Sequence, residues 1–216
     1  MVRGMDGAAR DPGAERARMV AEQIAARGVA DPRVLAALAE VPREAFLPEA
    51  RRGAAFEDHP VPLAHGQTLS QPYIVAFMAE ALELTGAERV LDVGAGSGYA
   101  SAVLARLAVR VTAVELVPEL ASLASENLRA LDVLNVQVFE ADGARGWPRE
   151  APFDAILVAC AASSIPVALV DQLAEGGRMI LPVGEPFGSQ WLVRVRKKGG
   201  RVLREDLLPV AFVPMR

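Results

Sequence analysis

The sequence contains one cysteine, Cys160, and two histidines, His59 and His65, among its 216 residues. A single cysteine cannot form an internal disulfide, and it agrees with a reducing compartment. Because no cysteine or histidine pair has the spacing of metal ligands, we expect no metal site.

Long apolar runs and an excess of positive charge are also missing. No apolar run approaches the roughly 20 residues that a membrane-spanning helix needs, and the first fifteen residues lack the apolar region of a secretory signal. The formal net charge of -4 argues against a nucleic-acid partner. We therefore expect a cytoplasmic protein that binds neither membranes nor nucleic acid. We also expect it to be a monomer.

What is present suits a soluble globular protein, because 52% of the residues are hydrophobic and 23% are charged. Residues 1–14 have few bulky apolar side chains, and we expect them to form a disordered tail. Residues 15–216 are long enough for one domain with a sizeable core. We divide this domain into a helical, substrate-side extension over 15–85 and an α/β core over 86–216.

The extension begins with two predicted helices. The first runs from Glu15 to about Arg27, and Gly28 is a typical residue for its end. Asp31 predicts the cap of a second helix, with Pro32 in its first turn.

A later helix begins near Pro72, directly after Ser70. The hydroxyl of Ser70 could cap this helix, which is the simpler interpretation. However, small and polar residues crowd the segment before it, including Gly66, Gln67 and Thr68. This helix leads into the strand that carries Asp92, so its start could instead lie beside a ligand. Both interpretations stay open at this point.

Residues 90–99 read Val-Leu-Asp-Val-Gly-Ala-Gly-Ser-Gly-Tyr and organise the rest of the core. A buried strand that passes through a glycine loop into a helix is the opening unit of an open parallel α/β sheet. The glycine spacing is G-x-G-x-G, whereas a dinucleotide loop has G-x-G-x-x-G and would need glycine where Tyr99 stands.

Charge distinguishes the ligands that this loop could bind. Asp92 lies at the strand end just before the glycines, where a carboxylate would repel a pyrophosphate. An ammonium group and hydroxyls would suit that carboxylate. S-adenosylmethionine carries these groups and no phosphate, so we interpret the segment as an S-adenosylmethionine loop. A nicotinamide dehydrogenase is disfavoured, and a glycine turn without ligand remains the simpler alternative.

Two further acidic residues follow predicted strands of this core. Glu115 ends the strand over 110–114 and lies about twenty residues after the loop, where an acid binds ribose hydroxyls in this architecture. Its alternative is a solvated charge at a strand end. Asp142 and Gly143 follow the strand over 135–139, where Asp142 could bind the adenine amino group or form a plain turn.

The remaining core pattern predicts a fourth strand over 153–158 and a helix through 169–173 that stops at Gly176 and Gly177. A fifth strand follows over 179–182. Apolar and polar residues alternate in segments 190–196 and 203–213, which lie on either side of the glycine pair at 199–200. This pattern predicts two antiparallel strands at the sheet edge. The fold class is therefore α/β, a mostly parallel, doubly wound sheet with an antiparallel edge.

Taken together, these segments resemble the protein-L-isoaspartate O-methyltransferases, a family with the Rossmann-like class I methyltransferase fold. The resemblance extends from about residue 18 to the C-terminus. The glycine loop alone would indicate a methyltransferase, while Thr-Leu-Ser-Gln-Pro at 68–72 is specific to this family. The segments that carry the resemblance are 41–46, 66–73, 90–99, 114–115 with 118–120, 142–143 with 146–148, 151–154, 172–173 with 176–177, 181–184 and 212–214.

The resemblance implies a protein-L-isoaspartate(D-aspartate) O-methyltransferase. Such a repair enzyme moves a methyl group from S-adenosyl-L-methionine to the α-carboxylate of L-isoaspartyl residues in damaged proteins and peptides. The ester then closes to a succinimide, which leads to normal aspartyl. Ser70 corresponds to the family's active-site serine. The positions that would bind the cofactor are Thr68, Asp92, Gly94, Gly96, Glu115, Asp142 and Gly143.

One departure from the family pattern is Ala159-Cys160, where a threonine and an alanine are more usual. It puts local packing beside the cleft in doubt, and Cys160 itself suits a small buried apolar position. Two alternatives stay open: another acceptor (an aspartate of a modified peptide, a small molecule or RNA), or a non-catalytic S-adenosylmethionine-binding module.

Overall fold

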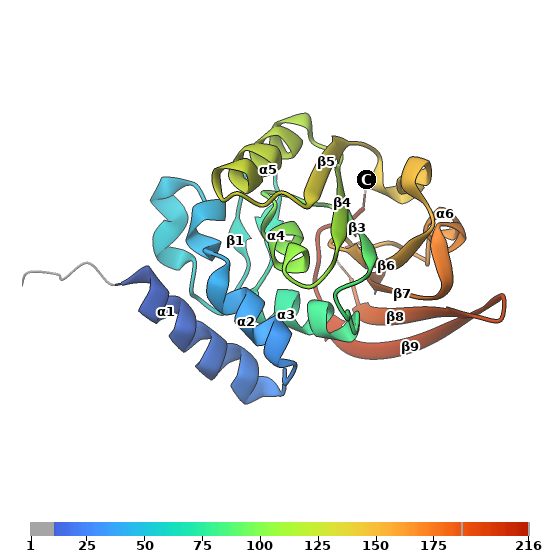
Figure 1. Ribbon diagram of the computed structural model, residues 1–216, viewed down its shortest axis with the longest axis horizontal. Coiled ribbons are helices and arrows are strands. Elements are labelled where there is room, and N and C mark those ends of the chain that lie inside the picture. Colours follow the sequence, from blue (N-terminus) through green and yellow to red (C-terminus); the bar gives the residue numbers. More distant parts are fainter. Residues whose placement is uncertain (1–10, 187, 216) are drawn as a thin grey trace, which may run out of the picture.

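The computed structural model describes residues 11–186 and 188–215 (Figure 1). Its helices are α1 (Pro12–Met19), α2 (Pro32–Glu40), α3 (Pro72–Ala81), α4 (Tyr99–Ala105), α5 (Pro118–Ala130) and α6 (Val167–Asp171). Its strands are β1 (Val61–Pro62), β2 (Thr68–Leu69), β3 (Arg89–Val93), β4 (Arg110–Glu115), β5 (Val136–Glu140), β6 (Phe153–Val158), β7 (Leu173–Gly184), β8 (Gln190–Lys198) and β9 (Arg201–Val210).

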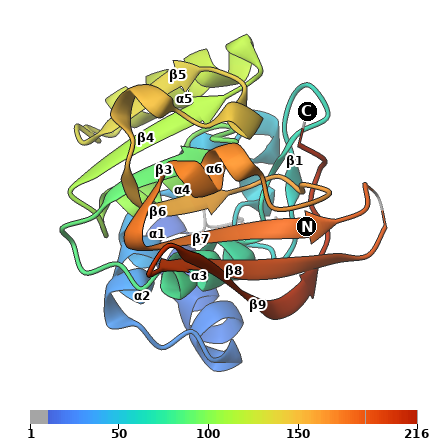
Figure 2. The same cartoon turned by 90° about the vertical axis from the view of Figure 1, so that its right-hand side faces the viewer.

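The main sheet has seven strands in the order β5-β4-β3-β6-β7-β8-β9, which Figure 2 shows from one face. The strands from β5 to β7 pair in parallel, and β8 and β9 add the antiparallel edge. The predicted fold class is confirmed. None of the described helices is long and apolar enough to cross a bilayer.

The N-terminal helices follow from local signals, with one correction at the start. The predicted tail over 1–14 is wrong for its last residues, because α1 begins at Pro12. The side chain of Asp11 accepts a hydrogen bond from the N–H of Gly13 at 2.9 Å and so caps this helix. Residues 1–10 lie outside the described part of the chain.

Beyond Met19 the same helical path continues as a π-helical turn, Val20–Ile24, and a 3-10 turn, Ala25–Arg27. Gly28 ends it with φ 98°, a conformation that favours glycine. Asp31 caps α2 by accepting a hydrogen bond from the N–H of Arg33 at 2.8 Å, as predicted.

Successive side chains of the central strands point to opposite faces of the sheet. Val90 of β3 packs with the N-terminal helices, α3 and α4, whereas Leu91 and Val93 pack with Leu169 of α6 on the other face. Both faces are covered, which explains the near-continuous apolar runs of these strands. Asp92 shares the face of Val90 and therefore points toward α4.

The prediction between α6 and β7 is wrong. The helix ends at Asp171, and the strand begins at Leu173, so that Gly176 and Gly177 lie inside β7. The pairing with β6 shifts register here, from Phe153 opposite Leu173 to Ala155 opposite Arg178. A Cβ at Gly177 would lie 2.8 Å from the carbonyl oxygen of Ala174, so the shifted segment requires glycine.

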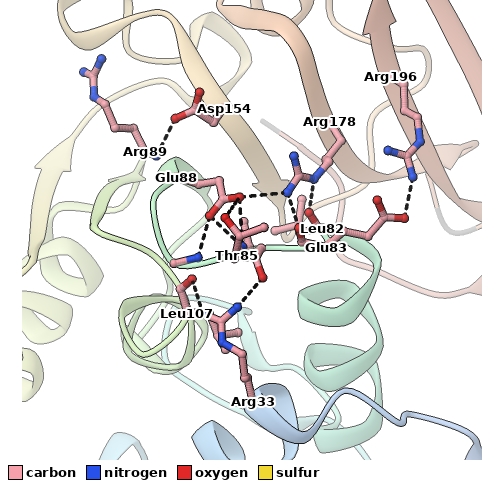
Figure 3. Close-up of polar contacts among 12 residues, drawn as sticks. Arg33, Leu82, Glu83, Thr85, Glu88, Arg89, Leu107, Asp154, Arg178 and Arg196 are labelled. Atoms are coloured by element: carbon pink, nitrogen blue, oxygen red, sulfur yellow. Dashed lines mark hydrogen bonds and ion pairs between the residues drawn. The ribbon is translucent and has the colours of Figure 1, made fainter.

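A polar cluster lies where the parallel strands begin, at the sheet end opposite the glycine loop (Figure 3). Glu88 precedes β3, is 8% exposed and accepts hydrogen bonds from the N–H groups of Thr85 and Gly86. Arg178 of β7 donates to Glu88 at 3.2 Å and also to the carbonyl groups of Leu82 and Glu83. This cluster ties the end of α3 to the central strands.

Candidate functional site

A cavity lies at the carboxyl ends of β3 and β4, beside the point where the strand order reverses between β3 and β6. Open α/β sheets bind ligands at this switch point. The residues that line the cavity come from 67–70, the glycine loop, 114–117, 143, 159–160 and 213–215, with Val75, Tyr99 and Ala100.

The glycine loop uses its backbone N–H groups inside the protein. The N–H groups of Gly94 and Ala95 both donate to the carbonyl oxygen of Val114, at 2.9 and 3.2 Å, and that of Gly96 donates to Glu115. Gly94 and Gly96 have φ values of 85° and 57°, which glycine adopts without strain. A phosphate-binding loop needs free N–H groups. This loop therefore does not offer the cradle that a pyrophosphate requires.

Glu115 lies at the end of β4, lines the cavity and is 7% exposed. Its Oε2 accepts from the N–H of Gly96 at 2.8 Å, and its Oε1 accepts from the N–H of Val117 at 3.0 Å. An ionised carboxylate has about four lone-pair sites, so two hydrogen bonds leave it able to accept ligand hydroxyls. Ribose binding by Glu115 stays a prediction that this geometry allows.

Asp92 is fully buried behind the loop and does not line the cavity. Its Oδ2 accepts from the hydroxyl of Ser101 on α4 at 2.5 Å, while Oδ1 has no hydrogen-bond partner among the described residues. Burial, together with the charge of Glu115 and against the lowering effect of the Ser101 hydrogen bond, raises the pKa of Asp92 to about 6. Direct contact of Asp92 with the cofactor stays a prediction.

Ser70 does not cap α3, so the simpler interpretation of this residue is wrong. Gln71 occupies the cap position, and its side chain bonds Asp58 instead of the helix. Residues 68–69 pair with Val61 and Pro62, which holds the chain extended up to Ser70. Ser70 lines the cavity above, and it also lines a second cavity.

The second cavity has a volume of about 520 Å³ and adjoins the first. The two share Thr68, Ser70, Ala159 and Val213. Its other walls come from Arg27 and Pro60, from the start of α3 and from the chain at the end of β9, residues 208–213. Ser70 therefore lies between a cavity beside the glycine loop and a larger one that leads away from it.

Asp142 and Gly143, the two residues predicted to lie beside the adenine, have different positions in the structure. Gly143 lines the first cavity, where a Cβ would lie 2.5 Å from Cγ1 of Val93, so only glycine fits this approach. Asp142 is exposed, and its carboxylate accepts from the N–H of Ala144 at 2.9 Å. It thus has the turn role that the sequence left open, while its adenine contact stays a prediction.

Several lining residues were not predicted as site residues. Ser97 is 1% exposed, and its hydroxyl has no partner among the described residues. Residues 213–215, near the C-terminus, also line the cavity. In the sequence, only the resemblance of segment 212–214 to the family pointed to them. Cys160 was expected at a small, buried apolar position, and in the structure its side chain forms part of the cavity wall. Burial raises the pKa of its thiol to about 12, so the thiol stays neutral.

Comparison with known proteins agrees with this geometry. The family model of protein-L-isoaspartate(D-aspartate) O-methyltransferase matches residues 14–216. The chain belongs to this family. The resemblance found in the sequence is confirmed.

Individual members of the protein-L-isoaspartate O-methyltransferase family are similar over most of the chain. A relative from Rhodopseudomonas palustris strain HaA2, protein-L-isoaspartate O-methyltransferase 1, is 56% identical over 94% of this chain and 83% of its own. Protein-L-isoaspartate O-methyltransferase 2 from Anaeromyxobacter sp. strain Fw109-5 is 54% identical over 95% of this chain and 84% of its own.

Solved structures agree as well. A protein-L-isoaspartate O-methyltransferase with 29% identity superposes with a TM-score of 0.83, covering 92% of this chain and 65% of that one. A structure from Plasmodium falciparum, described as a protein of the same family in complex with S-adenosyl-L-homocysteine, has 29% identity and a TM-score of 0.79. It covers 93% of this chain and 98% of that one.

Proposed function

We propose that this chain transfers a methyl group from S-adenosyl-L-methionine to the α-carboxylate of L-isoaspartyl residues in proteins and peptides. The position of Ser70 between two adjoining cavities carries this proposal. One cavity lies beside the glycine loop and suits the cofactor. The other extends from Ser70 along α3 and suits the chain of the acceptor.

The residues around the first cavity fit S-adenosylmethionine better than a dinucleotide. The N–H groups of Gly94, Ala95 and Gly96 are already bonded within the protein, and Glu115 with the buried Asp92 makes this region acidic. The hydroxyl of Ser97 is a buried group in need of a partner. We assign the cofactor to Thr68, Asp92, Gly94, Gly96, Glu115, Asp142 and Gly143. When bound, its sulfonium supplies the methyl group.

The acceptor needs no base from the protein. An α-carboxyl group has a pKa of about 3.3–3.7 and is ionised at neutral pH, so His59 and His65 have no proton to remove. The task left for Ser70 is to donate a hydrogen bond that orients the carboxylate. Alignment of the acceptor oxygen with the methyl group and the sulfur as a whole supplies roughly 7–11 kcal/mol in well-aligned reactions, and Ser70 contributes one hydrogen bond to it. The half-buried position of Ser70 suits this role.

The product of this step repairs itself without further help from the enzyme. The methyl ester is attacked by the neighbouring backbone nitrogen, which closes a succinimide and releases methanol. Hydrolysis of the succinimide then yields normal aspartyl or returns isoaspartyl. The protein therefore needs one site and no hydrolytic residues.

Two peptides that differ only in aspartyl versus isoaspartyl, incubated with methyl-labelled S-adenosylmethionine, test the proposal. We expect label in the isoaspartyl peptide alone. Equal labelling of both peptides would indicate another acceptor, and binding of S-adenosylhomocysteine without any methyl transfer would indicate a non-catalytic module. Tight binding of a nicotinamide dinucleotide would contradict the cofactor assignment.

Four broader expectations remain proposals. They are a monomeric state, the absence of a nucleic-acid partner, a cytoplasmic location, and one domain over 15–216 with its extension over 15–85. Sedimentation of the purified chain tests the first of these, and titration with RNA tests the second.

A further inference from the structure

The second cavity contains a charge that the proposed reaction does not use. Among the described residues that line it, Arg27 is the one charged side chain. Arg27 ends the 3-10 turn Ala25–Arg27 of the N-terminal extension, far in sequence from the glycine loop. The remaining walls include apolar side chains of α3 and of the segment after β9, among them Ile74, Leu208 and Phe212.

Two contacts hold the guanidinium of Arg27 in place. It lies 3.5 Å from the ring centroid of Tyr73, in the first turn of α3. Its Nη1 donates to Oδ2 of Asp58 at 2.9 Å, and Gln71 donates to the other carboxylate oxygen of Asp58 at 2.8 Å. Cation–π stacking and an ion pair therefore fix the side chain at the cavity wall.

This arrangement leaves donors for a ligand. A guanidinium has five N–H donors in a planar fork, and the described hydrogen bonds of Arg27 use Nη1 alone. The side chain is 42% exposed, so its other donors are open to an incoming group. Arginine pairs with carboxylates through two parallel hydrogen bonds, which makes a carboxylate the chemistry that this wall fits.

We infer that Arg27 is a specificity-determining residue that favours acceptor peptides with an acidic side chain close to the isoaspartyl residue. The inference rests on the proposed function, because it assumes that the acceptor chain leaves Ser70 through the second cavity. Asp58 already forms an ion pair with Arg27, so a second carboxylate would add less to the affinity for the peptide. A partly exposed ion pair of this kind changes affinity by about one-and-a-half- to fivefold.

Paired isoaspartyl peptides test this preference. Each pair differs only in Glu versus Gln, placed at one of the four positions on either side of the isoaspartyl residue. For the natural chain we expect kcat/KM to be about one-and-a-half- to fivefold higher for the Glu peptide at one of these positions. In Arg27→Gln this ratio should fall to about one, and in Arg27→Lys it should largely persist.

The ratio separates recognition from a purely structural role of Arg27. Loss of stacking on Tyr73 would lower kcat/KM for both peptides of a pair equally, and such a result would overturn the inference. Arg18→Gln on α1 is the matched control, because Arg18 pairs with Glu15 at the surface, and it should leave the ratio unchanged. If Arg27→Gln does not fold, 0.5 M salt should weaken the preference of the natural chain, since screening reduces exposed pairs.

Failure of this inference differs from failure of the proposed function. Equal ratios in the natural chain and Arg27→Gln at every position would refute the role of Arg27 while methyl transfer persists. No transfer to any isoaspartyl peptide would refute the function itself.

Discussion

The N–H of Gly96 donates a hydrogen bond to Oε2 of Glu115 at 2.8 Å, across 19 positions of sequence. The other oxygen of this carboxylate accepts from Val117 at 3.0 Å. One buried side chain thus holds the glycine loop against the end of β4 and also faces the cavity assigned to the cofactor. The shape of the loop and the recognition of the ligand depend on the same group.

Glu115→Gln should therefore weaken cofactor binding and loosen the loop together. An amide has one acceptor oxygen, so one of the two N–H groups would face an NH₂ group instead. We expect S-adenosylhomocysteine affinity to fall at least about tenfold and the free energy of unfolding to fall by about 1–3 kcal/mol. Calorimetric titration and urea unfolding measure the two effects. Glu126→Gln, exposed on α5, is the control, and unchanged affinity in Glu115→Gln would remove its binding role.

Ser70→Ala should lower turnover without weakening the protein, because Ser70 does not cap α3. We expect kcat to fall while S-adenosylhomocysteine affinity and the unfolding midpoint stay nearly constant. Asp31→Ala is the opposite control: it removes a cap hydrogen bond of 2.8 Å and should cost about 1 kcal/mol of stability. A Ser70→Ala variant with full activity would refute the catalytic assignment.

The contrast between Asp31 and Ser70 shows what local sequence signals decide. Asp31 precedes a proline by one residue and caps α2, and Gly28 ends the helix before it, both as predicted. Ser70 lies two residues before Pro72, so the residue directly before that proline, and therefore the cap position of α3, is Gln71. The rule that places proline at the first helical position decides both caps, and the prediction for Ser70 was displaced by one residue.

Tertiary effects explain the other differences. Gly176 and Gly177 are typical of a helix end, yet they lie in a register shift between β6 and β7, which depends on the neighbouring strand. Arg27 and residues 213–215 reach the cavities from opposite ends of the chain. In contrast, the strand over 153–158 was predicted with its observed bounds, because a strand buried on both faces has a continuous apolar run.

Asp92→Asn should change the pH dependence of stability. The pKa of Asp92 is raised to about 6 in the folded chain, chiefly because of burial, from an ordinary value of 3.8. Both states hold the proton below pH 3.8, whereas above about pH 6 the folded state carries a buried charge that costs up to about 3 kcal/mol. Asparagine removes this cost.

The stability of Asp92→Asn relative to the natural chain should therefore rise between pH 4 and pH 6 and stay constant above that range. Urea unfolding across this range measures the difference, with exposed Asp132→Asn as the control. The same variant should bind S-adenosylhomocysteine more weakly, because the acidic charge near the loop is lost. A stability difference that is independent of pH would show that Asp92 has an ordinary pKa.

For Glu88, at the other end of the sheet, we expect the opposite pH dependence of stability (Figure 3). Burial favours its neutral form, but hydrogen bonds from Thr85 and Gly86 outweigh this effect and lower the pKa of Glu88 to about 2. Its contribution to stability is complete above the unfolded pKa of about 4.3 and is lost as the pH falls toward 2. Glu88→Gln should therefore cost about 2–3 kcal/mol at pH 7 and clearly less at pH 3.

Glu83→Gln is the matched control in the same cluster, because Glu83 pairs with Arg194 and Arg196 but is 49% exposed. Exposed pairs contribute about 0–1 kcal/mol, so this variant should lose little at either pH. Urea unfolding of both variants at pH 7 and pH 3 separates the two cases. Since Glu88 links the start of β3 to Arg178 of β7, an equal, small loss in both variants would mean that the cluster does not hold these strands together.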